Sequence, residues 1–361
     1  MITMTISSYS GEILQTTKDE LLNLTAAEMD FKFNEEKEGS HLAVYLQAGF
    51  PVNFLQKHYL PTIKAKLEHI YPSLKIDVHL DSFIKAHQTQ LAGKGLRGVK
   101  NTIAIASGKG GVGKSTVTVN LATALARAGA RVGILDADIY GPSIPLMLGQ
   151  HKPVEISGEH YLPVKAHGIE AMSIGYLMPS DEQALIWRGP MLAKSLIQML
   201  NLTLWDELDY LFIDLPPGTG DIQLSLVQKI PLTGAVVITT PQPVATLDAQ
   251  KAIQMFAKTN INVLGIVENM SYHNCSQCGH QDRLFGEGGG QKLASNFNLP
   301  LLGQLPLDQH IRNHCDIGQP TAILANNELS TIFTKTALNL AINIAKKPLN
   351  YADRFPPIVV E

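Results

Sequence analysis

The sequence is poor in cysteine, in net charge and in long apolar runs. Only three cysteines occur in 361 residues, without the spacing of a disulfide framework, and this is typical of a protein from a reducing compartment. The 29 basic and 32 acidic residues leave a net charge of -3, which argues against a strongly basic nucleic-acid-binding domain. No apolar run reaches the roughly 18 residues of a membrane-spanning helix, and the first residues lack a signal-peptide pattern. We therefore expect a cytoplasmic protein with neither membrane nor nucleic acid as a partner.

A glycine-rich loop is the most informative feature that is present. Residues 108–115 read Gly-Lys-Gly-Gly-Val-Gly-Lys-Ser, between a strand-like segment at 103–106 and a helix-forming segment at 116–125. This is the context of a P-loop, whose glycines let the main chain wrap closely around a triphosphate at a helix N-terminus. Lys114 is placed to reach the outer phosphates, and the Ser115 hydroxyl to ligate Mg2+. The sequence therefore predicts a nucleotide site.

The loop carries an additional lysine, Lys109, on its outer limb. Lys109 is either a surface charge or a residue that reaches the nucleotide of a second subunit, in the manner of an arginine finger supplied in trans. The sequence of this loop resembles the deviant Walker A motif of the MinD-like ATPases, which work as face-to-face homodimers. This resemblance favours the role in trans.

Two further strand-like segments end in carboxylates. Residues 131–135 lead into Asp136 and Asp138, and residues 210–213 lead into Asp214. Ligands of open α/β sheets bind at this carboxyl edge, so we expect Asp214 to be the Walker B carboxylate and Asp136 to help hold Mg2+ and its waters. In the MinD-like ATPases the position of Asp138 orients the attacking water. Turn or helix-capping roles are the alternatives for Asp136 and Asp138.

Two more residues are expected near the nucleotide. The glycine-rich segment 214–221 can swing when a γ-phosphate is bound or lost, and we interpret Gly218 as the γ-phosphate sensor. Asn269 follows a strand-like segment at 263–267; the resemblance implies an adenine contact, and a plain turn residue is the alternative. The predicted nucleotide-binding residues are Gly108, Lys109, Gly110, Gly111, Val112, Gly113, Lys114, Ser115, Thr116, Asp136, Gly218 and Asn269.

Two of the cysteines form a Cys-x-x-Cys-Gly knuckle, Cys275 and Cys278. A tight turn after the second cysteine directs backbone N–H groups at the sulfurs, as in metal knuckles. An iron-sulfur cluster normally takes four thiolates, and one chain offers two here. In a C2 homodimer the pairs from both subunits converge at the axis. We therefore predict a labile cluster, preferably 4Fe-4S, that bridges two subunits.

The knuckle has other interpretations: a redox couple, two unremarkable thiols, or a zinc ligand pair. His273 and His280 flank the cysteines within one eight-residue segment, which is too short to place four ligands tetrahedrally around one ion. A zinc ion bound by the cysteines of two chains remains an alternative interpretation. The third cysteine, Cys315, is expected to be half-buried and structural.

Together, the motifs resemble those of the Mrp/ApbC group over about residues 95–345; they comprise 108–115, 135–145, 187–191, 214–221 and the knuckle. The resemblance implies a slow ATPase that carries an iron-sulfur cluster and transfers it to apoproteins, with a cluster-assembly scaffold as donor. The implied catalytic residues are Lys109, Lys114, Asp138 and Asp214, and residues 188–191 are implied to lie near the dimer interface.

Two rival functions are a MinD/ParA-like positioning ATPase and a zinc-bridged, ATP-dependent targeting factor. The first requires a basic amphipathic helix at the C-terminus, whereas this chain ends in Ile-Val-Val-Glu. The second requires a Met-rich apolar groove.

The predicted fold is α/β: a P-loop NTPase domain with a mostly parallel sheet flanked by helices (residues 101–347), preceded by a small α+β domain (1–84). A flexible, mildly basic linker (85–100) joins them, and a tail (348–361) follows. Within the small domain, which we interpret as a docking or stabilising module, we expect helices at 17–29 and 52–70 and strands at 42–46 and 74–80. A last helix is expected at 329–346.

Overall fold

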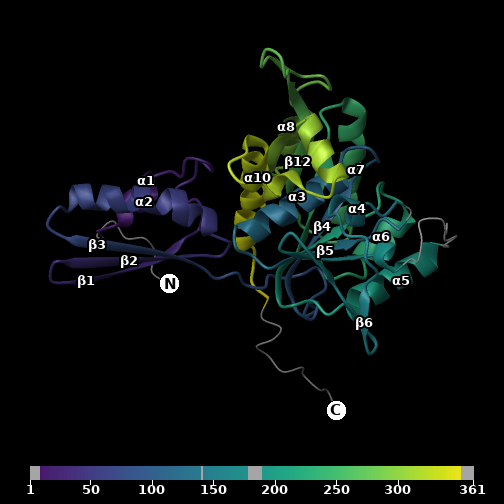
Figure 1. Ribbon diagram of the computed structural model, residues 1–361, viewed down its shortest axis with the longest axis horizontal. Coiled ribbons are helices and arrows are strands. Elements are labelled where there is room, and N and C mark those ends of the chain that lie inside the picture. The colour runs from purple at the N-terminus through teal and green to yellow at the C-terminus, as the bar shows by residue number, and fades with distance from the viewer. Residues whose placement is uncertain (1–8, 140, 178–188, 351–361) are drawn as a thin grey trace.

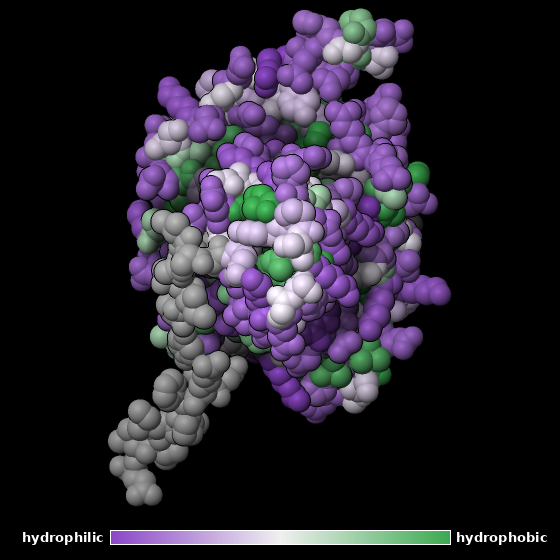
Figure 2. Space-filling view, turned by 90° about the vertical axis from the view of Figure 1, so that its left-hand side faces the viewer, coloured by the Kyte–Doolittle hydropathy of each residue, from purple (hydrophilic) through white to green (hydrophobic). Residues whose placement is uncertain are grey.

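The computed structural model describes residues 9–139, 141–177 and 189–350 (Figure 1). It contains a small N-terminal domain, which lies at the left in Figure 1, and a large domain built on a nine-stranded sheet. Seen end on, the small domain presents a mostly hydrophilic surface with a few separate hydrophobic residues (Figure 2).

The small domain has a three-stranded sheet in the order β1-β2-β3, with β1 antiparallel and β3 parallel to β2. Helix α2 packs on this sheet because Leu55, Tyr59, Ile63 and Leu67 recur every fourth residue and are all buried. The elements are α1 (Gly11–Thr16), β1 (Lys32–Glu38), β2 (His41–Ala48), α2 (Asn53–Ile70) and β3 (Lys75–Ser82).

The predicted helix at 17–29 is wrong, because the helix is α1 and the following residues form turns. The Asp19 carboxylate accepts hydrogen bonds from the N–H groups of Leu21 and Leu22, and Thr25 and Glu28 bond each other's main-chain N–H groups. These local side-chain contacts compete with a continuous helix. The predictions of α2, β2 and β3 are confirmed to within three residues at each end.

The large sheet has the order β13-β12-β11-β4-β10-β5-β9-β8, with β14 also paired to β12. Only β8 and β13 pair antiparallel with their neighbours; the other pairings are parallel. The strands are β4 (Val99–Ser107), β5 (Val132–Asp136), β8 (Val164–Ala166), β9 (Ile169–Ser173), β10 (Leu208–Asp214), β11 (Gly234–Thr239), β12 (Val263–Asn274), β13 (Gln281–Asp282) and β14 (Leu301–Pro306). The short hairpin β6 (Glu155–Ser157) and β7 (His160–Leu162) stands apart.

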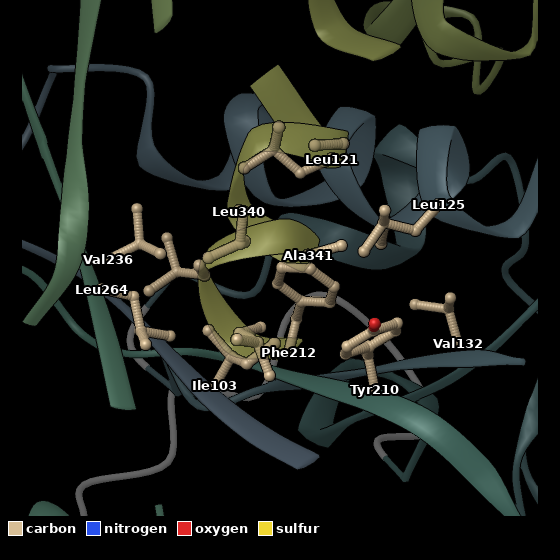
Figure 3. Close-up of a cluster of buried hydrophobic side chains, with 14 of the residues drawn as sticks. Ile103, Leu121, Leu125, Val132, Tyr210, Phe212, Val236, Leu264, Leu340 and Ala341 are labelled. Carbon is tan, nitrogen blue, oxygen red and sulfur yellow. The ribbon is translucent and has the colours of Figure 1, made fainter. Parts of the chain in front are cut away.

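Helices α3 and α10 pack together on one face of this sheet. Figure 3 shows Leu121 and Leu125 of α3 and Leu340 of α10 facing strand residues such as Ile103 and Phe212, and all five side chains are fully buried. The helices are α3 (Lys114–Arg127), α4 (Ile144–Met147), α5 (Gly189–Leu202), α6 (Asp221–Val227), α7 (Pro243–Lys258), α8 (Gly289–Asn296), α9 (Gln309–Asp316) and α10 (Glu328–Ala345). Within the described residues, no helix is long and apolar enough to span a membrane.

The segment expected to be a flexible linker packs against the large domain instead. His87 is buried, and both its main-chain N–H and its Nδ1 bond the Asn101 side-chain oxygen at 3.2 and 2.9 Å. The Gln90 side chain donates to the carbonyls of Val227 and Ile230. Glycine content suggested flexibility, but these polar side chains fix the segment through long-range hydrogen bonds.

Candidate nucleotide and cysteine sites

The glycine-rich loop joins β4 to α3 at the carboxyl edge of the sheet. Gly111 and Gly113 both adopt a φ of +80°, a region that favours glycine, and Gly113 is the N-cap of α3. A Cβ on Gly108 would clash with the main chain of Asp248 in α7. The loop thus brings main-chain N–H groups to the start of a 14-residue helix, which is the arrangement that binds phosphate.

Lys114 and Asp214 form a buried ion pair beneath the loop, with Nζ and Oδ2 2.7 Å apart. The hydroxyl of Ser115 donates to the same carboxylate oxygen at 2.6 Å, and the hydroxyl of Thr118 donates to the other at 2.7 Å. The P-loop and the Walker B strand are therefore in direct contact. Thr118 was not among the predicted site residues, although its position four residues after Lys114 puts both on one face of α3.

Asp136 lies directly opposite Asp214 in the register of β5 and β10, and both are fully buried. Burial and the neighbouring Asp214 raise the pKa of Asp136 to about 7, although Lys114, the Ile144 N–H and the Ser173 hydroxyl act in the other direction. The site thus holds two buried carboxylates against one ammonium. A hard divalent cation that takes oxygen ligands fits this donor set, with the Ser115 hydroxyl beside it.

Asp138 follows two residues later, half-buried, and its N–H donates to an Asp136 oxygen at 3.2 Å. Gly218 contacts the end of β4, where the P-loop begins: its N–H donates to the Ser107 carbonyl at 3.0 Å, and its φ is +101°. The roles of both residues at the γ-phosphate stay predictions. Lys109 is half-buried and its carbonyl accepts from the Ser107 hydroxyl.

Asn269 touches the P-loop from β12. Its side-chain amide donates to the Val112 carbonyl at 2.9 Å and packs so closely on Gly113 that a Cβ there would clash with it. The next residue, Met270, has a φ of +55°, and the pairing of β12 with β14 shifts register between Glu268 and Tyr272. The geometry thus gives Asn269 a contact with the loop, while the adenine contact stays a prediction.

Buried Glu268 fixes this irregular part of β12. One carboxylate oxygen accepts from the hydroxyl of Ser271 and the amide of Gln304 at 2.9 and 2.8 Å, and the other accepts from the Gly290 N–H at the start of α8. The sequence analysis did not predict this role of Glu268, because its partners Gly290 and Gln304 lie 22 and 36 residues away along the chain.

The two knuckle cysteines lie at the tip of a hairpin that extends β12 beyond the sheet, at the top of Figure 1. Cys278 is exposed and Cys275 partly so. The turn is closed by the Cys275 N–H on the His280 carbonyl and the Gly279 N–H on the Cys275 carbonyl. Main-chain N–H groups of Gln277 and Cys278 lower the pKa of the Cys275 thiol, as a metal-binding knuckle requires.

The flanking histidines have other partners. His273 Nδ1 lies 3.0 Å from the Leu307 carbonyl, and His280 Nε2 lies 3.3 Å from an Asp282 oxygen. Across residues 9–139, 141–177 and 189–350, no group of three or more His, Cys, Asp or Glu is arranged to hold a metal ion. One chain therefore offers two thiols and no third ligand at this tip.

Cys315 in α9 is buried, with 3% exposure, rather than half-buried as expected. The Asn120 amide of α3 lies 3.7 Å from its sulfur, and burial raises the pKa of the thiol to about 11. Of the implied interface residues 188–191, Arg188 lies outside the described residues.

A P-loop whose lysine pairs with the aspartate ending a neighbouring parallel strand defines a nucleotide-binding P-loop NTPase. The chain belongs to the NUBPL iron-transfer P-loop NTPases of the ParA group, whose family model matches residues 98–342. The exposed Cys-x-x-Cys hairpin lies within these matched residues.

The chain is similar to proteins named iron-sulfur cluster carrier protein. Those of Haemophilus influenzae and Escherichia coli K12 are 59% and 56% identical over 245 and 253 residues, which cover 67% and 69% of this chain and 66% and 68% of theirs. That of Pseudomonas fragi is 52% identical over 265 residues, 72% of this chain and 92% of its own length. A solved nucleotide-binding protein from Archaeoglobus fulgidus, in complex with ADP, is 42% identical with a TM-score of 0.55, covering 62% of this chain and 88% of its own.

Proposed function

We propose that the protein is an ATP-hydrolysing carrier that binds an iron-sulfur cluster between two identical subunits and transfers it to apoproteins. A cluster-assembly scaffold supplies the cluster. The observation that carries this proposal is the accessible pair of Cys278, which is exposed, and Cys275, which is partly exposed; the pair lacks a third ligand within the described part of the chain.

The number of ligands supports a shared site. A 4Fe-4S or two-iron cluster takes four thiolates, and a twofold axis through the hairpin tips brings two pairs together. The lowered pKa of Cys275 favours the thiolate that binds iron. A cluster held at an exposed tip between subunits is accessible to a recipient, which suits transfer rather than permanent storage.

The nucleotide site supports hydrolysis of ATP. Lys114 and a Mg2+ ion held near Ser115, Asp136 and Asp214 would neutralise the β- and γ-phosphates. Asp138 orients a water molecule whose oxygen attacks the γ-phosphorus as the bond to the bridging oxygen of ADP breaks; one proton of the water stays on the released phosphate and the other passes to solvent. Lys109 of each subunit reaches the nucleotide of the other, so that hydrolysis depends on dimerisation.

Strand β12 connects the two sites. Asn269 contacts the P-loop, and six residues later Cys275 begins the knuckle. A change in the loop on binding or loss of the γ-phosphate would therefore act on the strand that carries the thiols. We propose this strand as the path by which nucleotide state affects cluster binding.

The test is the amount of iron and sulfide bound per dimer after anaerobic reconstitution, measured with the absorption spectrum. We expect one cluster per dimer, lost in Cys275→Ala and Cys278→Ala and retained in the matched control Cys315→Ala. ATP should change the rate of transfer to an apo-ferredoxin in the wild type and have no effect in Lys114→Ala.

Two results would overturn the proposal. One is a colourless dimer in which zinc alone fills the site after reconstitution with iron and sulfide. The other is a full cluster in either knuckle variant, because the thiols would then not be its ligands.

A further inference from the structure

A second, positively charged cavity lies where the two domains meet, away from the P-loop and the knuckle. It has a volume of about 220 Å³. The small domain, the segment after β3 and the end of α10 all contribute to its wall, and these parts adjoin one another in Figure 1. Its lining includes Lys32, Lys85, Lys346 and Lys347 against one carboxylate, Asp30.

The positive charge of the cavity exceeds the negative charge of the neighbouring acids, which are Asp30 in the lining and Glu28, whose carboxylate interacts with the Lys346 ammonium. None of these four lysines forms an ion pair with a carboxylate of the described residues. Lys346 donates to the Glu28 carbonyl at 2.7 Å, and the ammonium of Lys85 lies 5.3 Å from the centre of the Phe83 ring. Like charges gathered in a concave site raise the local concentration of anions.

The floor of the cavity is firmly packed. Gly49 approaches Ala345 so closely that a Cβ on the glycine would lie 3.0 Å from the alanine Cβ. His87 is buried there on the Asn101 side chain, and burial lowers its pKa, so it adds a neutral ring to the wall. The lysines and these packed residues therefore line the same cavity.

We propose that this cavity binds a compact polyanion bearing carboxylate or phosphate groups. The volume is below the roughly 300–1,000 Å³ of sites for drug-sized ligands, so the ligand is small. Lysine ammonium groups act as point charges that bind either kind of oxyanion. Because the wall belongs to both domains, the ligand fixes the small domain against the large one and stabilises the chain by linkage.

The proposal is independent of the cluster and is tested on the full chain. Citrate and inorganic pyrophosphate serve as the two probes in calorimetric titrations, with the P-loop filled beforehand by saturating ADP and Mg2+. We expect saturable binding of at least one probe, weakened by added salt. Binding of citrate alone or pyrophosphate alone would identify the ligand as a carboxylate or a phosphate.

Charge reversal at the half-buried positions Lys85 and Lys347 is the test of location. Lys85→Glu and Lys347→Glu should each raise the Kd at least tenfold, while Lys335→Glu, an equal charge change on the exposed side of α10, should leave it unchanged. Circular dichroism checks that each variant is folded, and Lys85→Gln and Lys347→Gln replace any reversal variant that is not. Absence of binding at millimolar concentrations of both probes, or equal binding by the folded cavity variants, would overturn the proposal.

Discussion

Asp136 and Asp214 lie opposite each other at the ends of two adjacent parallel strands, both fully buried, with Lys114 as the cation that pairs with Asp214. Two carboxylates enclosed together are unfavourable unless positive charge balances them. The two strand ends thus form a negatively charged site that attracts a cation, and Lys114 supplies part of the compensating positive charge.

Lys114→Ala removes the cation from a buried pair and leaves Asp214 uncompensated. We expect the free energy of unfolding to fall by about 3 kcal/mol or more and ATP binding to be lost. Lys109 lies on the same loop but forms no ion pair with a carboxylate of the described residues, so Lys109→Ala should retain wild-type stability. Urea denaturation and titration with a fluorescent ATP analogue measure both effects. Equal denaturation midpoints for the two variants would contradict this account.

Gly108→Ala and Gly110→Ala should differ although both lie in the same loop. A Cβ on Gly108 meets the main chain of Asp248, which cannot move without displacing α7, whereas a Cβ on Gly110 meets only the Pro217 ring at 4.0 Å. We expect a lower melting temperature for Gly108→Ala and little change for Gly110→Ala, measured by calorimetry. A similar loss in both variants would show that backbone flexibility, not space, requires these glycines.

Asn269→Ala breaks the hydrogen bond to Val112 and leaves a buried carbonyl without its partner. A loss of about 1–3 kcal/mol in stability is expected, against almost none for Asn274→Ala at the exposed end of β12. Titrations with ATP and GTP distinguish a role of Asn269 in holding the P-loop from a role in contacting adenine. If Asn269 acts only through the loop, both nucleotides bind more weakly by the same factor; selective loss of ATP affinity would show the adenine contact instead.

The three cysteines should react with iodoacetamide in a fixed order in the metal-free protein. Cys275 has a lowered thiol pKa and is accessible, so it reacts fastest at pH 7.5, whereas Cys315 is buried and reacts only after unfolding. Mass spectrometry of timed samples gives the order. Early labelling of Cys315 would mean that α9 opens readily.

Cys315 also predicts a pH dependence of stability. Its thiol pKa is raised from 9.0 to about 11 in the folded chain, so its contribution is complete below pH 9 and is lost as the pH rises from 9 to 11. A shift of two pKa units corresponds to about 3 kcal/mol. The stability difference between wild type and Cys315→Ala should narrow by up to that amount across this range, as measured by urea denaturation. A constant difference would show that the thiol does not ionise there.

The sequence predicted the local motifs well because each is a short run whose chemistry depends on its own neighbours. The P-loop, the strand that ends in Asp214 and the Cys-x-x-Cys turn lie where their spacing suggested. The expectation of a helix at 17–29 failed, because the side chains of Asp19, Thr25 and Glu28 stabilise turns there.

The sequence by itself determined the class of the protein, the nucleotide loop and the number of thiols, since each of these depends on residue types at short, fixed spacing. Only the tertiary structure decided which distant groups meet: Thr118 with Asp214, Asn269 with Val112, and the lysines of both domains around one cavity. The physical reason is the register of the parallel sheet and the packing of the helices on it. These bring together residues that lie up to hundreds of positions apart in the sequence. A local sequence pattern does not predict such contacts.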